Sequence, residues 1–239
     1  MLRLWNWKVA VCRRLMTAGL LVVPAVLAVE ASGQDAATDA VPAEALIDDL
    51  DEGFVALFDG RLLTGWEGDG KWFRVEDGAI VAGDLEKRIP HNYFLATTRT
   101  YADFELRLEI KAVGEGANGG VQFRSRRVPG SSEVSGYQAD VGGVSDRLVW
   151  GSLYDESRRN RFLQEADAEQ VAAAAKPDGW NDYRIRCVGP KIELYINGVK
   201  TVDYTETDES IPRTGVIAVQ VHSGPPVELW YRKLRIKPL

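Results

Sequence analysis

The sequence predicts an all-β protein, an antiparallel β-sandwich of jelly-roll type with one short helix. Three observations lead to this fold class. Short segments of alternating polarity recur from residue 54 to the end, Gly-rich turns separate them, and one stretch alone has a helical pattern. About ten short strands with a single helix are typical of a sandwich or jelly roll.

The first 33 residues have the order of an export signal. Four basic residues precede the apolar run LMTAGLLVVPAVLA, and small residues follow it. We expect cleavage after Gly33 or, alternatively, after Ala28. The run is short for a membrane span, so we expect a periplasmic or secreted protein with no membrane association after signal cleavage. The Arg13-Arg14 pair leaves open whether export uses the general secretory or the twin-arginine route.

Residues 34–52 are acidic and Ala-rich without a clear period, which predicts a flexible tether before a domain over 53–239. The whole chain carries 29 basic and 35 acidic residues; without the predicted signal, 25 and 34 remain, a net charge of −9. This charge disfavours nucleic acid and anionic membrane as partners, because long-range repulsion opposes both.

Individual strands follow from alternation and turn residues. DFELRLEIKA places Phe104 and every second residue to Ile110 inward, and KIELYINGVKTVDY predicts a hairpin whose turn is Asn197-Gly198. DAEQVAAAAK, residues 167–176, predicts the helix and ends before Pro177. The further strands are expected at 72–75, 79–82, 93–98, 120–126, 135–141, 148–153, 180–188, 215–222 and 227–237.

One cysteine, Cys187, remains once Cys12 leaves with the signal. It shares the parity of Tyr183 and Ile185, so we expect it to point inward and to be unreactive. A single cysteine makes no intramolecular disulfide and no Cys-rich metal site.

Polar side chains occupy one face of three predicted strands. GGVQFRSRR places Gln122, Arg124 and Arg126 on one face by strict alternation. GYQADVG and VQVHSG add further members, namely Gln138, Asp140, Gln220 and His222. This pattern is compatible with a solvated outer sheet, or with a sugar-sized binding site in which the side chains converge.

A family resemblance accompanies this pattern. FVALFDGRLLTGW, NGGVQFRS, GYQADVG, GWNDYRI, INGVKTVDY, GVIAVQVHSG and LWYRKLRIKPL, in this order, make the chain similar to the 3-keto-disaccharide hydrolase domain family. The resemblance covers about Phe54 to Leu239. It implies a concanavalin A-like jelly roll in exported bacterial proteins that cleave glycosides already oxidised to a ketone at C3.

The resemblance also implies site residues. The family's Arg corresponds to Arg124, its Gln and His to Gln220 and His222, and a C-terminal Arg to Arg232. The chain departs from the family at Gln138, where a glutamate is common. If that glutamate is a required acid or base, its role here has been lost or moved to Asp140.

The implied chemistry is removal of the C2 proton beside the ketone, followed by departure of the C1 oxygen. We expect His222 to be the base, since imidazole titrates near neutral pH. Arg124 would stabilise the enolate, and Asp140 would orient the imidazole or protonate the leaving oxygen. The expected substrate-binding residues are Gln122, Gln138, Gln220, Arg126, Tyr154, Glu156 and Arg232, with Tyr154 or Glu156 as a further acid.

Several alternatives stay open. Ordinary sandwich-fold glycosidases carry paired carboxylates, often as E-x-D-x-x-E, and no such run is present. No cofactor or metal is expected, although His222, Asp140 and Glu156 could form a divalent-metal site, and His91 is expected in a loop.

The main alternative function is a non-catalytic, lectin-like carbohydrate-binding module. Trp66, Trp72, Trp150 and Trp230 could stack on sugar rings, or could belong to the core. In both cases the expected partner is a small-molecule or oligosaccharide substrate or ligand. The sequence does not define the oligomeric state.

Overall fold

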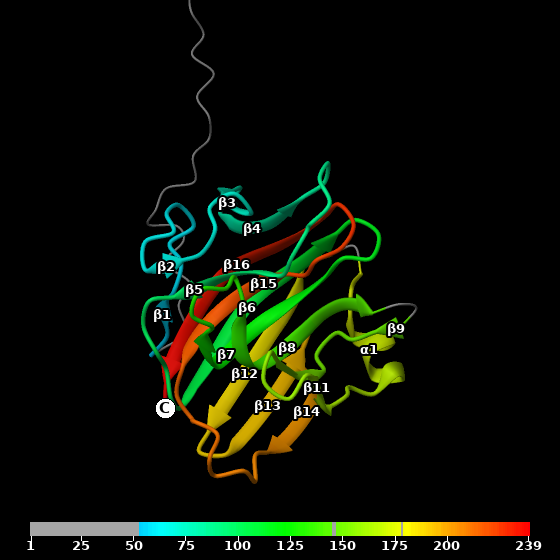
Figure 1. Cartoon of the computed structure of the whole chain (residues 1–239). Helices are drawn as coiled ribbons and strands as arrows, with labels where there is room; N and C mark the ends of the chain where they lie inside the picture. The colour runs from blue at the N-terminus through cyan, green and yellow to red at the C-terminus, as the bar shows by residue number, and fades with distance from the viewer. Residues whose placement is uncertain (1–52, 145–146, 178) are drawn as a thin grey trace, which may run out of the picture. The chain divides into compact units, whose positions relative to one another are not determined.

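The computed structural model describes residues 53–144, 147–177 and 179–239 (Figure 1). The predicted signal peptide, 1–33, and the predicted tether, 34–52, lie outside the described residues. In the described part of the chain, no helix has the length and apolar character needed to cross a bilayer.

Within these residues two antiparallel sheets of eight strands each form the sandwich, which confirms the predicted fold class (Figure 1). Sheet A has the order β14-β13-β12-β6-β16-β4-β3, with β1 paired to β16. Its strands are β1 (Val55–Ala56), β3 (Phe73–Glu76), β4 (Ala79–Asp84), β6 (Phe104–Val113), β12 (Asn181–Val188), β13 (Lys191–Ile196), β14 (Val199–Thr205) and β16 (Val227–Pro238).

Sheet B has the order β11-β10-β8-β7-β15-β5-β2, with β9 paired to β8. Its strands are β2 (Trp66–Glu67), β5 (Tyr93–Thr97), β7 (Asn118–Arg127), β8 (Val134–Val144), β9 (Arg147–Leu148), β10 (Leu153–Glu156), β11 (Arg161–Gln164) and β15 (Val216–Val221). The inner faces of both sheets supply the core, and the outer face of sheet B carries most of the predicted site.

The core follows the alternation read from the sequence. In β6, Phe104, Leu106, Leu108 and Ile110 are buried, and the residues between them are partly exposed. Cys187 is buried as expected, and burial raises the pKa of its thiol to about 12, so it stays protonated at neutral pH.

Local signals also placed the hairpin turn and the helix correctly. Asn197 and Gly198 both have positive φ, 47° and 83°, as a two-residue turn between twisted strands requires. The helix α1 (Ala168–Ala174) begins after Asp167, whose side chain accepts a hydrogen bond from the N–H of Gln170. It lies beside β9 and β14 (Figure 1).

The strand expected at 148–153 is wrong. Residues 149–152 form a turn closed by a 3.0 Å bond from the Ser152 N–H to the Val149 carbonyl, with Gly151 at φ 69°. The flanking residues belong to two separate short strands, β9 and β10. The short strands β1, β2 and β11 were not predicted, because two to four residues carry too little periodicity to detect.

Candidate functional site

The outer face of sheet B carries a group of buried polar side chains, here called the polar cluster. Its members come from β7, β8, β10 and β15: Gln122, Gln138, Asp140, Glu156 and Gln220. Tyr154 and the imidazole of His222, which follows β15, are half-buried at its edge. Of the predicted site residues, the structure thus brings together seven.

Strand register explains this convergence. Gln122 lies opposite Gln138, and Gln138 lies opposite Tyr154, so three strands contribute one row. In the adjacent row Gly120 lies between Gln220 and Asp140. A Cβ at Gly120 would come within 2.6 Å of the Gln138 side chain, so the glycine leaves the space that Gln138 occupies.

A chain of hydrogen bonds orders one side of the cluster. Ser125 Oγ donates to Gln122 Oε1 at 2.7 Å, Gln122 Nε2 donates to Gln138 Oε1 at 2.7 Å, and Gln138 Nε2 donates to Asp140 Oδ1 at 2.8 Å. The side-chain amides of Gln122 and Gln138 each accept a hydrogen bond through Oε1 and donate one through Nε2. All three hydrogen bonds therefore run in the same direction and end at the carboxyl of Asp140.

Gln220 has an unsatisfied acceptor. Its side chain is fully buried, and its Nε2 lies 3.4 Å from Oε2 of Glu156. Among the described residues, its Oε1 has no hydrogen-bond partner. A buried amide oxygen without a partner costs about 1–3 kcal/mol, so this atom is a position where a ligand hydroxyl or a water would bind favourably.

The two carboxyl groups of the cluster are shifted toward the protonated form. Burial, reinforced by the charge of Glu156, raises the pKa of Asp140 well above its ordinary value, against the hydrogen bond from Gln138. Burial and the nearby Glu133 likewise raise the pKa of Glu156, while His222 and Gln220 oppose that shift. At a given pH, a larger fraction of these two groups is therefore in the protonated form, which can donate a proton, than of exposed carboxylates.

The neighbouring phenol responds to the same charges. Burial and then the carboxylates of Glu156 and Asp140 raise the pKa of Tyr154, so its hydroxyl remains a hydrogen-bond donor. Its ring packs edge-on against Phe162 of β11, with the ring centroids 5.1 Å apart. Tyr154 is thus held at the edge of the cluster with its O–H intact.

His222 is oriented by its own backbone neighbour. Its Nδ1 lies 2.7 Å from the carbonyl oxygen of Ser223, which can only accept, so Nδ1 carries a proton. In the neutral ring the lone pair is then on Nε2. The backbone N–H of His222 is bonded to the carbonyl of Asn118 at 3.0 Å, which fixes the end of β15 against β7.

Two tyrosines of sheet A cross the core and hold the strands of the cluster. Tyr231 Oη donates to the carbonyl of Gln220 at 2.6 Å, and Tyr183 Oη donates to the carbonyl of Asp140 at 2.6 Å. Burial raises the pKa of both phenols, so both remain donors. The core thereby fixes the backbone positions from which Gln220 and Asp140 project.

The expectation that Arg124 and Arg126 share a face with Gln122 is wrong. A β-bulge in β7 between Phe123 and Arg126 inserts one residue, and Arg124 adopts a positive φ of 47°. Beyond the bulge, Arg126 is exposed and lies opposite Ser135 of β8. Without the inserted residue it would align with the even-numbered residues of β8, which include Gln138 and Asp140. The bulge instead turns Ser125, expected to point inward, toward Gln122.

Arg124 is fully occupied away from the cluster. Its side chain is 2% exposed, and it donates to the carbonyls of Ala102 and Gly189, each at 2.7 Å, and to Asp103 Oδ1 at 2.6 Å. The expectation that Arg232 binds substrate together with the cluster residues is also wrong, because β16 belongs to sheet A. Arg232 pairs with Glu109 at 2.6 Å and stacks over Trp180 on the outer face of that sheet.

Sequence reasoning missed one group beside the cluster, the carboxylate of Glu133. Glu133 follows the loop at 128–132 and is close enough to raise the pKa of Glu156. It also lines a hollow of about 390 Å³ beside the cluster, together with Phe94, Arg127 and Val134. No signal in the sequence indicates this approach, because the loop reaches the face through tertiary folding.

Other expectations concern metals and aromatic residues. In the residues with described positions, no three metal-ligating side chains are gathered as an ion would require. Trp66, Trp72 and Trp150 are buried in the core, and Trp230 is half-buried on sheet A. His91 is exposed in a loop.

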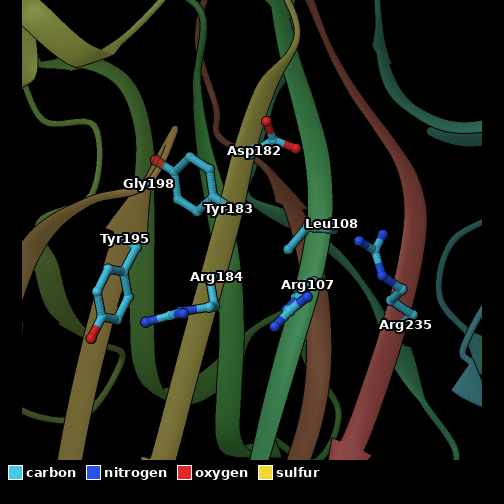
Figure 2. Close-up of a pocket in the computed structure, with 8 residues that line it drawn as sticks. All are labelled: Arg107, Leu108, Asp182, Tyr183, Arg184, Tyr195, Gly198 and Arg235. Atoms are coloured by element: carbon cyan, nitrogen blue, oxygen red, sulfur yellow. The ribbon is translucent and has the colours of Figure 1, made fainter. Parts of the chain in front are cut away.

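A second hollow lies on the outer face of sheet A (Figure 2).

Solved structures share this fold. A glycosyl hydrolase candidate from Parabacteroides distasonis ATCC 8503 has 21% identity and a TM-score of 0.59, over 79% of this chain and 94% of that chain. The carbohydrate-binding module CBM66 from Bacillus subtilis has 14% identity and a TM-score of 0.54, over 72% and 94%. The β-glucanase of Bacillus licheniformis has 9% identity and a TM-score of 0.50, over 80% and 95%.

At these identities the structural likeness shows the fold alone. No curated protein matches the chain in sequence. The model of the 3-keto-alpha-glucoside-1,2-lyase-like domain, however, matches residues 53–237, nearly the whole described part. The chain therefore belongs to the 3-keto-disaccharide hydrolase family, as the sequence resemblance predicted, and this membership supports a carbohydrate-active function.

Proposed function

We propose that this protein is an exported enzyme that cleaves 3-keto-glycosides at the polar cluster. The observation that carries the proposal is the buried Oε1 of Gln220, which has no hydrogen-bond partner among the described residues. The Nε2 of the same amide contacts Glu156, whose pKa also responds to His222. A sugar hydroxyl would satisfy this acceptor. It would bring the ring carbons next to a base and an acid. The family name supports the same substrate class.

The reaction begins with proton transfer from C2. The ketone at C3 acidifies this hydrogen, and the lone pair of His222 Nε2 takes it as the C2–H bond breaks. The electron pair moves onto the C3 oxygen as an enolate. The orientation of the ring by the Ser223 carbonyl serves this step, because it presents Nε2 as the proton acceptor.

The second step expels the C1 oxygen. The enolate pair returns to form the C1–C2 double bond, the C1–O bond breaks, and the leaving oxygen receives a proton. Glu156 supplies this proton, since burial and Glu133 favour its acid form. Tyr154 donates its O–H to the enolate oxygen, the role expected of Arg124 from the sequence. Addition of water at C1 then completes hydrolysis; without it the outcome is a lyase reaction.

The test is a panel of 3-keto-glycosides beside their unoxidised parents, assayed with purified mature protein. We expect cleavage of the keto compounds only. In deuterated solvent, recovered keto substrate or the hydrated product should carry deuterium at C2, whereas a lyase product has no hydrogen there. A hydrolysis product that keeps its original hydrogen at C2 would contradict the elimination route.

A carbohydrate-binding module is the second candidate, and two observations favour it. Arg124 is bonded elsewhere, and Gln138 stands where the family commonly has a carboxylate. Such a module would bind the parent and keto sugars without turning over either. Calorimetric binding of both classes, with no cleavage of any member of the panel, would select this candidate over the enzyme.

A further inference from the structure

A row of cationic side chains crosses the outer face of sheet A. Arg184 lies directly opposite Arg107, and Arg107 lies directly opposite Arg235, on three neighbouring strands. Tyr195 continues the row opposite Arg184. Like charges in directly opposed positions destabilise a sheet, so folding stability alone does not explain this arrangement.

The three arginines line a hollow of about 280 Å³ (Figure 2). Figure 2 shows Arg184 extending toward Tyr195, Arg107 on the adjacent strand, and Arg235 on the far side of the hollow. Asp182 is the one acidic residue of the lining. The volume exceeds what a single sulfate needs and is near the lower limit of small-ligand sites.

Two of the guanidinium groups are held by aromatic rings. Arg184 lies 3.7 Å from the centroid of the Tyr195 ring, and Arg107 lies 4.6 Å from that of Phe54. Stacking uses the flat face of a guanidinium and leaves its in-plane N–H donors for other partners. These groups are therefore oriented before any ligand arrives.

The protein leaves part of this donor capacity unused. Among the described residues, the buried Nε atoms of Arg184 and Arg235 have no hydrogen-bond partner. Nη1 of Arg235 lies 3.4 Å from the Lys233 carbonyl, a long contact. Arg107 differs, because Glu105 binds its Nε and Nη2 at 2.7 Å each.

We propose that this row binds an oxyanion, the carboxylate or sulfate group of an acidic saccharide, between Arg184 and Arg235. Guanidinium groups match the planar, multidentate geometry of such anions. The inference that the anionic group belongs to a saccharide rests on the proposed function. The inference that the site binds an oxyanion rests on the arginines alone. The site is on the sheet opposite the polar cluster, so binding here and turnover there are separable.

Calorimetry on the mature protein tests the proposal with three probes: an oligogalacturonate, a sulfated oligosaccharide and inorganic sulfate. We expect the acidic oligosaccharides to bind, and their neutral counterparts to bind at least about tenfold more weakly. Binding should weaken as salt is raised. If inorganic sulfate binds and neither acidic oligosaccharide does, the row is an oxyanion site but the inference that a saccharide carries the anion is overturned.

Variants localise the effect. Arg184→Gln and Arg235→Gln should each weaken binding about tenfold, since each removes charged hydrogen bonds. Arg186→Gln is the matched control, because Arg186 is on the same strand face and is paired with Glu193. Thermal melting of each variant verifies that it is folded. Equal loss in the control, or no binding by wild type, would overturn the site.

Two further results distinguish this site from the polar cluster and from an occupant within the same chain. His222→Asn should retain anion binding even if turnover is lost, so failure of the proposed function does not decide this site. Asp48, Asp49, Asp51 and Glu52 precede the described residues and are acidic. If binding occurs only after these four residues are neutralised, the chain's own acids occupy the row and the proposal is overturned.

Discussion

Gln220 and Glu156 are 64 residues apart in sequence, yet Nε2 of Gln220 lies 3.4 Å from Oε2 of Glu156. The contact joins β15 to β10, which are separated in sheet B by β7 and β8. It places a carboxyl beside an amide whose oxygen has no partner in the described part of the chain, and near enough to His222 for the histidine to lower the pKa of Glu156. The chemistry proposed for this face depends on that juxtaposition.

Replacing His222 by Asn should lower turnover of a 3-keto-glycoside by roughly 10²–10⁴-fold, the usual contribution of a positioned base. Asn keeps a hydrogen-bonding edge, so substrate binding and the unfolding midpoint should change little. Steady-state kinetics and C2 deuterium exchange are the measurements. His91→Asn, in an exposed loop, is the control, and full activity of His222→Asn would show that this histidine is not the base.

Replacing Glu156 by Gln should raise stability while lowering activity. The folded-state pKa of Glu156 is raised, so the fold binds its proton more tightly than the unfolded chain does. Wild-type stability therefore falls as pH rises above the ordinary value of 4.5, and the variant avoids this loss. Gln also keeps an oxygen that can accept from Gln220.

Urea unfolding at several pH values checks this. The variant should be more stable than wild type at about pH 8, and the gap should close near about pH 4. Turnover of the variant should fall and lose the high-pH decline that a required acid produces. Glu209→Gln, at an exposed position, should show neither effect. A variant less stable than wild type in the alkaline range would contradict the argument.

Replacing Glu206 by Gln should destabilise the fold by about 3 kcal/mol at neutral pH, as loss of one partner of a buried pair does. Burial opposes ionisation, but hydrogen bonds from Arg159, Tyr137 and the Asp208 N–H lower the pKa of Glu206 from 4.5 to about 2. A lowered folded-state pKa stabilises the fold above the unfolded value and loses that effect in acid.

The difference in unfolding free energy between wild type and Glu206→Gln should therefore be full above about pH 5 and shrink as pH falls toward about 2. Denaturant titrations across this range measure it, with Glu209→Gln as the exposed control. A difference that does not change with pH would mean that the carboxylate charge is not what stabilises the contact.

Replacing Arg124 by Lys should reduce stability by about 2 kcal/mol and leave turnover per folded molecule unchanged. Lysine cannot span the carbonyls of Ala102 and Gly189 together with Asp103, so charged hydrogen bonds are lost. Urea unfolding and kcat distinguish the two effects. Arg126→Lys, exposed on the same strand, should change neither, and a collapse of kcat without loss of stability would place Arg124 in the reaction.

Several elements could be predicted from the sequence because their signals are local. Alternation in β6 identified its buried face, Asn197-Gly198 identified the hairpin turn, and the helical pattern before Pro177 identified α1. The same two-residue period placed Gln138 beside Asp140 and Gln220 beside His222. These results hold because side-chain direction within one regular strand depends only on neighbouring residues.

The remaining features depend on tertiary structure. A single inserted residue at the bulge turned Arg124 away from Gln122, and alternation carries no sign of such an insertion. Membership of β16 in sheet A put Arg232 on the opposite side of the sandwich, because the period of a strand does not say which sheet it joins. The approach of Glu156 to Gln220, and the burial that shifts its pKa, arise only when four strands assemble, since proximity and desolvation are properties of the packed sheet.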